Sequence, residues 1–478
     1  MNRILNRQAF FADGTPFYRL YTSDGTGYGV RLRFRTAKDN AELVRVVTDS
    51  MKADMHKCFT EGRFDYYEVM LHYPECGTNY YFTVTGAETD EGKRTAVYNK
   101  RGVMDGVQDY YNFNFYPEFK TPDWAKGAIF YQIFTDRFCN GDPTNDVLDR
   151  EYSYVKLHSE QEKNWQAYPH VMDVCHFYGG DLQGIMDKLD YLQDLGIEVL
   201  YLNPIFVSPS NHKYDIQDYD YIDPHFGRIV DDAGEVLAKS DMDNRHASRY
   251  IRRVTNKKTL EASNELFVQF VEEVHRRGMK VILDGVFNHC GSFNKWMDRE
   301  QVYEGQEGYA PGAYVDEKSP YRSFFKFYSE KWPYNKDYDG WWGHDTLPKL
   351  NYEESESLCE YILRIGQKWV SPPYNVDGWR LDVAADLGHS PEYNHLFWKR
   401  FRKAANPNAL ILAENYTDPA SWLEGDEWDT VMNYEAFMEP ITWFLTGVEK
   451  HSDERRDDLL CNPETFEGAM SHHMSRFE

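Results

Sequence analysis

From residue 128 onward, short apolar runs alternate with amphipathic segments whose apolar residues have helical spacing. The segment 264–277, NELFVQFVEEVHRR, is one such helix, and another follows the Gly-Gly-Asp turn at 179–181. Runs of strand length that are apolar throughout are typical of parallel strands covered by helices. Six such runs occur, at 128–134, 197–205, 280–287, 376–384, 409–415 and 429–434. The sequence therefore predicts a parallel α/β fold in this part of the chain.

Up to about residue 120 the pattern is different, because the short runs alternate apolar and polar residues with a period of two. The runs 27–36, 41–49, 65–73 and 79–86 show it, with Gly, Asp and Asn between them. This alternation predicts a small antiparallel β-sandwich. The segment 115–127, which contains two prolines, is interpreted as a linker.

Two long segments, at about 207–262 and 290–355, interrupt the alternation of strands and helices. Loops of this length in a βα array are usually lids or small subdomains. They leave the carboxyl ends of the strands, where barrel enzymes carry their chemistry. We predict a sandwich domain at 1–120, a barrel domain formed by 121–289 and 356–478, and an inserted subdomain at 290–355.

Composition excludes two classes of partner and favours one compartment. With 53 basic and 78 acidic residues the formal charge is −25, so neither a nucleic acid nor an anionic membrane is expected to bind. The aromatic content of 16% supplies flat faces that stack on sugar rings or fill a core. Seven scattered Cys, and an N-terminal segment without an apolar secretory stretch, predict a cytoplasmic protein.

Polar residues stand where three of the apolar runs end. The carboxyl ends of parallel strands meet at one edge of a sheet, so these side chains are expected to converge. Each of them alone is explained equally well by a helix cap or a structural ion pair. A group of buried carboxylates, however, is costly unless it is paired or used. The group comprises Asp284, Asn288, His289, Arg380, Asp382 and Glu414.

Two carboxylates on neighbouring strands suit glycoside hydrolysis with retention, in which one attacks the anomeric carbon while the other protonates the leaving oxygen. Arg380, two residues before Asp382, is expected to hold that carboxylate ionised, as a nucleophile requires. Glu414 follows the apolar residues 410–413, which are expected to raise its pKa, as a general acid requires. These environments assign Asp382 as the nucleophile and Glu414 as the acid/base.

Several motifs resemble those of the α-amylase family of glycoside hydrolases. DGVFNH (284–289), GWRLDVA (378–384) and AEN (413–415) are similar to three of its ordered motifs, and HKYDIQDYDYIDPHFG (212–227) also resembles the family. LPKLN (347–351) resembles the form found in the neopullulanase, cyclomaltodextrinase and maltogenic amylase branch. The resemblance begins near residue 10 and implies a (β/α)8-type TIM barrel with an N-terminal, starch-binding-like β-sandwich.

The resemblance also implies an activity and a set of site residues. The expected reaction is retaining hydrolysis of α-1,4 or α-1,6 glucosidic bonds in cyclomaltodextrins, pullulan, starch or maltooligosaccharides, with Asp382 as nucleophile and Glu414 as acid/base. Members of this branch commonly form a homodimer through their N-terminal modules. The residues implied to bind the substrate or to support its site are Arg380, His289, Tyr214, His212, Asp284, Asn288, Lys349 and Asn351.

A structural calcium ion is a further expectation. The segment 140–146, NGDPTND, supplies several hard oxygen ligands within one loop, which suits Ca²⁺. Such a cluster is equally typical of an ordinary turn. The branch completes a site of this kind with a Gly-Gly-Asp turn. The resemblance thus implies a Ca²⁺ held by Asn140, Asp142, Asn145, Asp146, Gly179 and Asp181.

The sequence departs from the family pattern at its C-terminal end. The family's last motif, an apolar strand that ends in His-Asp, has no counterpart after Tyr434, and His472-His473 lies in a segment predicted to be helical. Because six of eight barrel strands are found, we expect a chain truncated before that motif and its third carboxylate. Two alternatives stay open: a non-catalytic α-glucan-binding protein on the same fold, and an isomerase or phosphorylase of the family.

Overall fold

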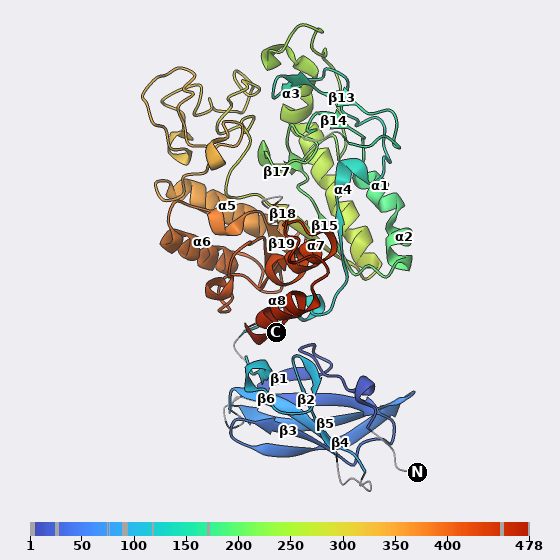
Figure 1. Cartoon of the computed structure of the whole chain (residues 1–478). Helices are drawn as coiled ribbons and strands as arrows, with labels where there is room; N and C mark the ends of the chain where they lie inside the picture. Colours follow the sequence, from blue (N-terminus) through green and yellow to red (C-terminus); the bar gives the residue numbers. More distant parts are fainter. Residues whose placement is uncertain are drawn as a thin grey trace. The chain divides into compact units, whose positions relative to one another are not determined.

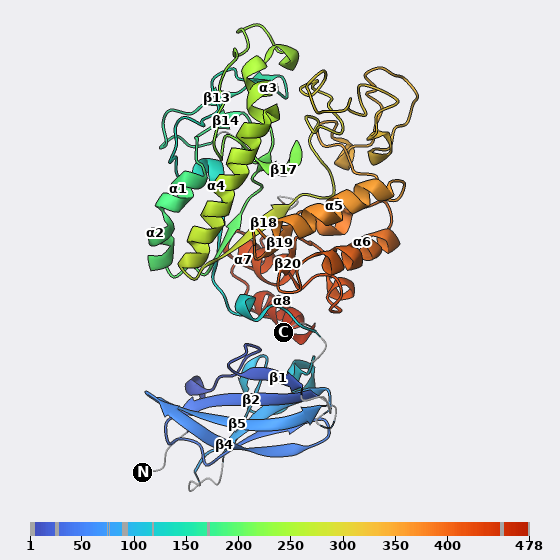
Figure 2. The same cartoon turned by 180° about the vertical axis from the view of Figure 1, so that it is seen from behind.

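The structure is a computed structural model that describes residues 5–23, 28–73, 75, 77–87, 94–116, 119–169, 173–449 and 454–476. The chain forms two compact units (Figures 1 and 2). One consists of Met1–Gly127 and Asn433–Glu478, and the other of Ala128–Met432. The predicted barrel domain includes 433–478, which the structure groups with the N-terminal residues. Residue 27 of the first predicted strand and residues 117–118 of the predicted linker lie outside the described residues.

The first unit is built on nine antiparallel strands that pair in the order β1-β2-β5-β4-β3-β6-β7-β8, with β9 beside β6. Along β2 the alternate residues Val30, Leu32 and Phe34 are fully buried, so one face of the strand packs on the core. The predicted runs correspond to β2, β3, β5 and β6. The bounds are β1 Arg19–Ser23, β2 Tyr28–Ala37, β3 Leu43–Thr48, β4 Lys52–Glu61, β5 Phe64–Tyr73, β6 Asn79–Thr85, β7 Thr95–Asn99, β8 Gly102–Met104 and β9 Phe113–Asn114.

Two helices from the C-terminal residues complete this unit, as the sequence predicts for that segment. They are α7, Glu439–Thr446, and α8, Pro463–Arg476. Gly447 ends α7 in the left-handed conformation, with φ of 68°, and its N–H bonds back to the carbonyl of Trp443. This is the usual way in which a glycine terminates a helix.

The second unit is organised by a six-stranded parallel sheet of order β10-β15-β18-β19-β20-β21. Each strand falls inside one of the six predicted apolar runs, which confirms the predicted parallel sheet. The observed strands are shorter than the runs because the residues at the run ends turn away from the ladder. The bounds are β10 Phe130–Ile133, β15 Val199–Leu202, β18 Lys280–Gly285, β19 Gly378–Leu381, β20 Leu410–Ala413 and β21 Thr430–Val431.

The helices α1, α2, α4, α5 and α6 of this unit pack on the sheet through their apolar faces, and α4 and α5 are neighbours, with the rings of Phe267 and Trp369 5.7 Å apart (Figures 1 and 2). α4 begins before the predicted residue 264, because the side chain of Asn256 caps it by accepting from the N–H groups of Lys258 and Thr259. The bounds are α1 Leu182–Asp187, α2 Leu189–Asp194, α3 Ser248–Thr255, α4 Lys257–Arg276, α5 Glu356–Trp369 and α6 Pro391–Ala404.

The long connections carry little regular structure. In 290–355 only two short 3₁₀ turns form, at Arg322–Phe324 and Trp341–Gly343. Elsewhere short strands pair in twos, as β11 Ser153–Tyr154 with β12 Leu157–His158, β13 Glu160–Gln161 with β14 His176–Phe177, and β16 Phe206–Val207 with β17 Asp218–Ile222. Within the described parts of the chain, no helix has the length and apolar character needed to span a membrane.

Candidate active site

The side chains predicted to converge do so at the carboxyl ends of β18, β19 and β20. Asp284 and Arg380 are direct partners in the register of β18 and β19, so they project from the same face of the sheet. Asp382 follows the last residue of β19, and Glu414 follows the last residue of β20. Each of the four is at most 8% exposed. The parallel strands thus bring three carboxyl groups and one guanidinium into a single buried cluster.

Arg380 links the three carboxyl groups. Its Nη1 donates to Oδ1 and Oδ2 of Asp284 at 3.0 and 3.1 Å, and to Oδ1 of Asp382 at 3.0 Å. Its Nη2 lies 2.9 Å from Oε2 of Glu414. Because one guanidinium faces three carboxyl groups, its charge cannot balance all of them in the ionised form.

The imbalance moves two pKa values in opposite directions. Burial raises the pKa of Asp382 well above its usual range, and the charges of Asp284 and Glu414 add to this rise against the opposing effect of Arg380. Burial acts on Glu414 in the same sense, but Arg380 and hydrogen bonds from Tyr416 and a backbone N–H lower its pKa. The sequence predicted an ionised Asp382 and a raised pKa for Glu414. Both directions are wrong, because the prediction left out the neighbouring carboxyl groups and the donors that face Glu414.

The two directions favour the proton on Asp382 rather than on Glu414. A side-chain hydrogen bond from Asp382 contributes to the lowered pKa of Glu414. A retaining glycosidase needs the opposite distribution at the start of its reaction, with the proton on the acid/base and a negative charge on the nucleophile. Transfer of the proton along this hydrogen bond produces that state, so the pair titrates as a unit.

Three tyrosines donate to the carboxyl groups. Tyr201 and Tyr214 both donate from Oη to Oδ2 of Asp284, at 2.5 and 3.0 Å. Tyr416, which is 46% exposed, donates from Oη to Oε1 of Glu414 at 2.5 Å. The sequence predicted only Tyr214 at the site. Tyr201 lies inside an apolar run, where a tyrosine is typical of a core. Tyr416 lies just after the predicted motif at 413–415.

The two predicted histidines lie beside Tyr214. Burial lowers the pKa of His289 to about 3 although its ring donates to the backbone carbonyl of Tyr214. His212 stacks on Tyr214 with ring centroids 5.9 Å apart, and burial lowers its pKa as well. Both imidazoles are therefore neutral at pH 7. A neutral imidazole adds no charge to the cluster, and Nε2 of His212 is not the nitrogen that accepts from the N–H of Tyr214, so it can face a sugar hydroxyl.

The inserted segment 290–355 reaches His289 at two points. The ring of Trp341 stacks on His289 with centroids 4.9 Å apart and planes 10° from parallel. The backbone of Lys349 forms an isolated antiparallel bridge with His289, while its ammonium donates to the carbonyl oxygen of Asp386 at 2.8 Å. Lys349 therefore lies next to His289, and its role in binding the substrate stays a prediction. Trp341 was not predicted, because the insertion is rich in aromatic residues and its sequence does not single this one out.

The two predicted asparagines differ in their surroundings. The amide nitrogen of Asn288 lies 3.1 Å from Nδ1 of His289, and its buried Oδ1 has no hydrogen-bond partner within the described residues. Asn351 is also buried, but its amide donates to Oε2 of Glu354 at 2.9 Å. Asn288 therefore supports His289 directly, whereas the observed contact of Asn351 is with its own loop.

The loop predicted to hold Ca²⁺ contains unsatisfied oxygen atoms. Oδ1 of Asn140 and Oδ1 of Asn145 are buried and accept no hydrogen bond within the described residues. Asp146 lies beside them, and burial raises its pKa to about 6. A Cβ added to Gly179 would stand only 2.4 Å from Oδ1 of Asp146, so the glycine lets the backbone close on this carboxylate. Two amide oxygens and a carboxylate form a donor set that fits Ca²⁺.

The other two predicted ligands make hydrogen bonds within the loop. Asp181 caps α1 by accepting from the N–H of Gly184 at 2.6 Å, and it also accepts from the N–H of Asp142 at 2.8 Å. Asp142 accepts from Oγ1 of Thr144 at 2.6 Å. No group of three or more His, Cys, Asp or Glu side chains suited to a metal occurs in the described residues. Binding here would therefore depend on the two asparagine oxygens and Asp146, and the six-residue ligand set stays a prediction.

Known families match both halves of the described fold. Residues 132–244 and 262–474 match the alpha amylase catalytic domain, and residues 20–119 match the alpha amylase N-terminal ig-like domain. The chain belongs to the alpha-amylase family. This membership confirms the predicted family and its TIM-barrel fold with an N-terminal β-domain.

Curated relatives and solved structures point to one branch of the alpha-amylase family. Neopullulanase 2 from Thermoactinomyces vulgaris is 35% identical over 413 residues, covering 83% of this chain and 57% of that protein. Intracellular maltogenic amylase from Bacillus subtilis (strain 168) is 33% identical over 443 residues, covering 88% of this chain and 62% of that protein. The chain thus spans less than two thirds of either relative. The type III pullulan hydrolase from Thermococcus kodakarensis superposes with a TM-score of 0.58 at 27% identity, covering 98% of this chain and 70% of that chain.

Proposed function

We propose that this alpha-amylase family chain hydrolyses α-1,4 or α-1,6 glucosidic bonds in short α-glucans with retention of configuration. The observation that carries the proposal is the buried cluster in which Arg380 binds Asp284, Asp382 and Glu414 at the ends of three adjacent strands. Relatives named neopullulanase, maltogenic amylase and cyclomaltodextrinase support the substrate class.

In the proposed reaction Asp382 attacks the anomeric carbon and Glu414 protonates the leaving oxygen. Glu414 then takes a proton from a water molecule whose oxygen attacks the anomeric carbon, and the bond to Asp382 breaks, which releases the sugar and restores the carboxylate. Tyr416 holds Oε1 of Glu414, and Arg380 fixes the separation of the two carboxyl groups. The cluster has more carboxyl groups than cations, so its excess negative charge stabilises an oxocarbenium-like transition state.

The proposed roles of the neighbouring residues follow from their neutrality. His212 and His289 bind sugar hydroxyls as neutral imidazoles, and Tyr214 offers a ring face. Asp284 accepts from Tyr201 and Tyr214, and in this way it orients Tyr214 toward the site.

Release of reducing sugar from β-cyclodextrin and from pullulan tests this proposal, with Asp382→Asn as the control. Proton NMR of the first product identifies its anomer, and an α-anomer is expected because the mechanism retains configuration. A folded chain that binds maltotriose but releases no sugar would favour the non-catalytic alternative.

We also propose a structural Ca²⁺ at the loop 140–146. The orphan oxygens of Asn140 and Asn145 and the carboxylate of Asp146 support it. The ion would supply positive charge that ties this loop to the turn at Gly179. Calorimetric titration with Ca²⁺ after treatment with EGTA tests the site.

A homodimer that forms through the N-terminal module and a cytoplasmic location complete the proposal. The first is supported by the resemblance to the branch, and the second by the relative from Bacillus subtilis that is named intracellular. A monomeric mass by light scattering would contradict the dimer.

A further inference from the structure

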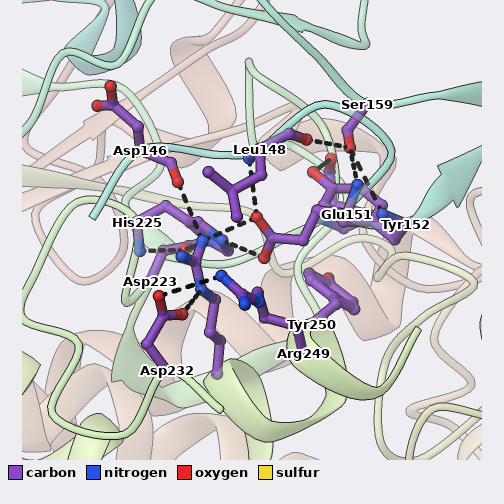
Figure 3. Close-up of polar contacts among 12 residues, drawn as sticks. Asp146, Leu148, Glu151, Tyr152, Ser159, Asp223, His225, Asp232, Arg249 and Tyr250 are labelled. Atoms are coloured by element: carbon purple, nitrogen blue, oxygen red, sulfur yellow. Dashed lines mark hydrogen bonds and ion pairs between the residues drawn. The ribbon is translucent and has the colours of Figure 1, made fainter. Parts of the chain in front are cut away.

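A buried row of alternating charges ends at the segment that carries His212 and Tyr214. The row joins segments that are far apart in the sequence, and each member is at most 4% exposed. Figure 3 shows its central part, in which the ring of His225 lies between the carboxylates of Glu151 and Asp223. In order of contact, the members are Arg253, Glu151, His225, Asp223 and Lys213.

Every link in the row is a short, charge-assisted contact. Nη1 of Arg253 donates to Oε2 of Glu151 at 2.8 Å, and Oε1 of Glu151 lies 2.8 Å from Nε2 of His225. Nδ1 of His225 lies 2.7 Å from Oδ1 of Asp223, and Nζ of Lys213 donates to Oδ2 of Asp223 at 2.7 Å. Both ring nitrogens of His225 therefore face carboxylates, an arrangement that only the protonated ring satisfies fully.

The electrostatics agree with this geometry. Burial opposes the charged form of His225, but Glu151 and Asp223 outweigh it and raise the pKa of the imidazole. Burial likewise opposes ionisation of Asp223, yet Lys213 and His225 lower the pKa of its carboxyl well below its usual range. Each carboxylate in the row lies between two cations, so the charges compensate one another.

The last member of the row occupies a strained position in the backbone. Lys213 has φ of 62°, a left-handed conformation that a residue with a long side chain adopts only when its surroundings hold it there. Its ammonium also donates to the carbonyl of Ser208 at 3.1 Å, and the N–H of Ser208 donates to Asp223 at 3.0 Å. Lys213 stands between His212 and Tyr214, so the direction of both side chains depends on its backbone.

We propose that His225 is a positioning residue for His212 and Tyr214, acting through Asp223 and Lys213. Its Nδ1–H fixes the carboxylate of Asp223, which fixes the ammonium of Lys213 and thereby the left-handed turn. The proposal rests on the proposed function, because it identifies what holds two of the proposed sugar-binding side chains in place.

Two isosteric substitutions separate the two halves of the row. The amide nitrogen of Asn in His225→Asn occupies the place of Nδ1 and keeps the link to Asp223. The amide nitrogen of Gln in His225→Gln occupies the place of Nε2 and keeps only the link to Glu151. His275→Gln is the matched control, because Nε2 of His275 makes a 2.6 Å contact with Asp377 at the opposite ends of the strands.

The readouts are amide hydrogen exchange of residues 211–216 by mass spectrometry and the affinity for maltotriose by calorimetry. We expect His225→Gln to speed exchange in this segment and weaken binding, each by about tenfold, because the left-handed turn loses its support. We expect His225→Asn to stay within about twofold of the unchanged chain. His275→Gln should change neither quantity, even where it lowers the melting temperature.

Equal behaviour of the two His225 variants, or unchanged exchange in His225→Gln, would overturn the proposal. Should His225→Gln fail to fold, Lys213→Met removes the last link, and unchanged exchange in that variant would also overturn it. Exchange does not depend on turnover. A chain that releases no sugar would thus refute the proposed function while the exchange pattern still decides the role of His225.

Discussion

Two buried polar clusters in the unit Ala128–Met432 differ in how their charges are balanced. In the cluster at the strand ends, Arg380 alone faces the three carboxyl groups of Asp284, Asp382 and Glu414. We call this the unbalanced cluster. In the row that ends at Lys213, which we call the balanced row, each carboxylate lies between two cations. Asp382 and Asp223 are similarly buried, at 8% and 1% exposure. Nevertheless the pKa of Asp382 is raised well above its usual range and that of Asp223 is lowered well below it.

The contrast shows that charge balance, rather than burial, decides what a buried carboxyl group can do here. In the balanced row the neighbouring charges favour the ionised forms of Asp223 and His225. In the unbalanced cluster the pKa of Asp382 is raised and that of Glu414 is lowered, a separation of the kind that acid–base chemistry uses. Replacing a carboxylate by its amide should therefore have opposite consequences for stability in the two regions.

The largest effect is expected for Asp382→Asn. Loss of the nucleophile should lower sugar release from β-cyclodextrin by at least about 10³-fold. The urea midpoint should not fall, because the substitution removes one of three like groups around a single cation. A substantial residual rate that Glu414→Gln abolishes would mean that another side chain is the nucleophile.

Replacing a carboxylate by its amide in the balanced row should lower the stability of the fold. We expect Glu151→Gln to lower the free energy of unfolding by about 3–5 kcal/mol, because it leaves the charges of His225 and Arg253 buried and partly uncompensated. Urea unfolding measures this difference. The control is Glu356→Gln, which removes an exposed ion pair with Arg400 and should cost about 0–1 kcal/mol. Similar losses in both variants would contradict the comparison.

Calcium should have a smaller effect, confined to the loop beside the balanced row. At a free concentration of 100 times Kd, a bound ion stabilises the folded chain by about 2.7 kcal/mol. EGTA should remove this increment, and Asn145→Ala should make the chain insensitive to added Ca²⁺. Thermal unfolding with Mg²⁺ in place of Ca²⁺ serves as the control. An equal response to the two ions would count against the proposed site.

The smallest effect concerns pH. Since the pKa of His225 is raised above its ordinary 6.5, the charged ring contributes its full stability below that pH and loses it as pH rises through the raised value. Because the pKa of Asp223 is lowered below its ordinary 3.8, its contribution is fully present above about pH 4 and stays constant in this window. The urea midpoint of the unchanged chain should therefore fall more between pH 6.5 and about pH 9 than that of His225→Gln. A parallel decline would contradict the charged state of His225.

Much of the fold could be predicted because buried parallel strands are apolar throughout. The six strands of the unit Ala128–Met432 were located in this way. β4, at Lys52–Glu61, was not predicted, because most of its residues are exposed and its sequence lacks alternation. The start of α4 was predicted too late, because its first turns are polar and only the capping contact of Asn256 shows where it begins.

The candidate site was predictable where its residues sit at strand ends, as Asp284, Arg380, Asp382 and Glu414 do. The protonation pattern was not, because it depends on distances among several charges rather than on one neighbour. The row that ends at Lys213 was not predicted either. Its contacts join residues as far apart as Glu151 and Arg253, and no local pattern in the sequence marks them as partners.

Covalent trapping on a Glu414→Gln variant tests the central claim most directly. Fluoride leaves α-maltosyl fluoride without help from an acid, so Asp382 can still attack, and without a base the glycosyl-enzyme accumulates. We expect mass spectrometry to find one maltosyl group on the peptide that contains Asp382, and none when Asp382→Asn is added. A folded Glu414→Gln chain without an adduct, or with the adduct on another residue, would contradict retaining hydrolysis by this pair of carboxyl groups.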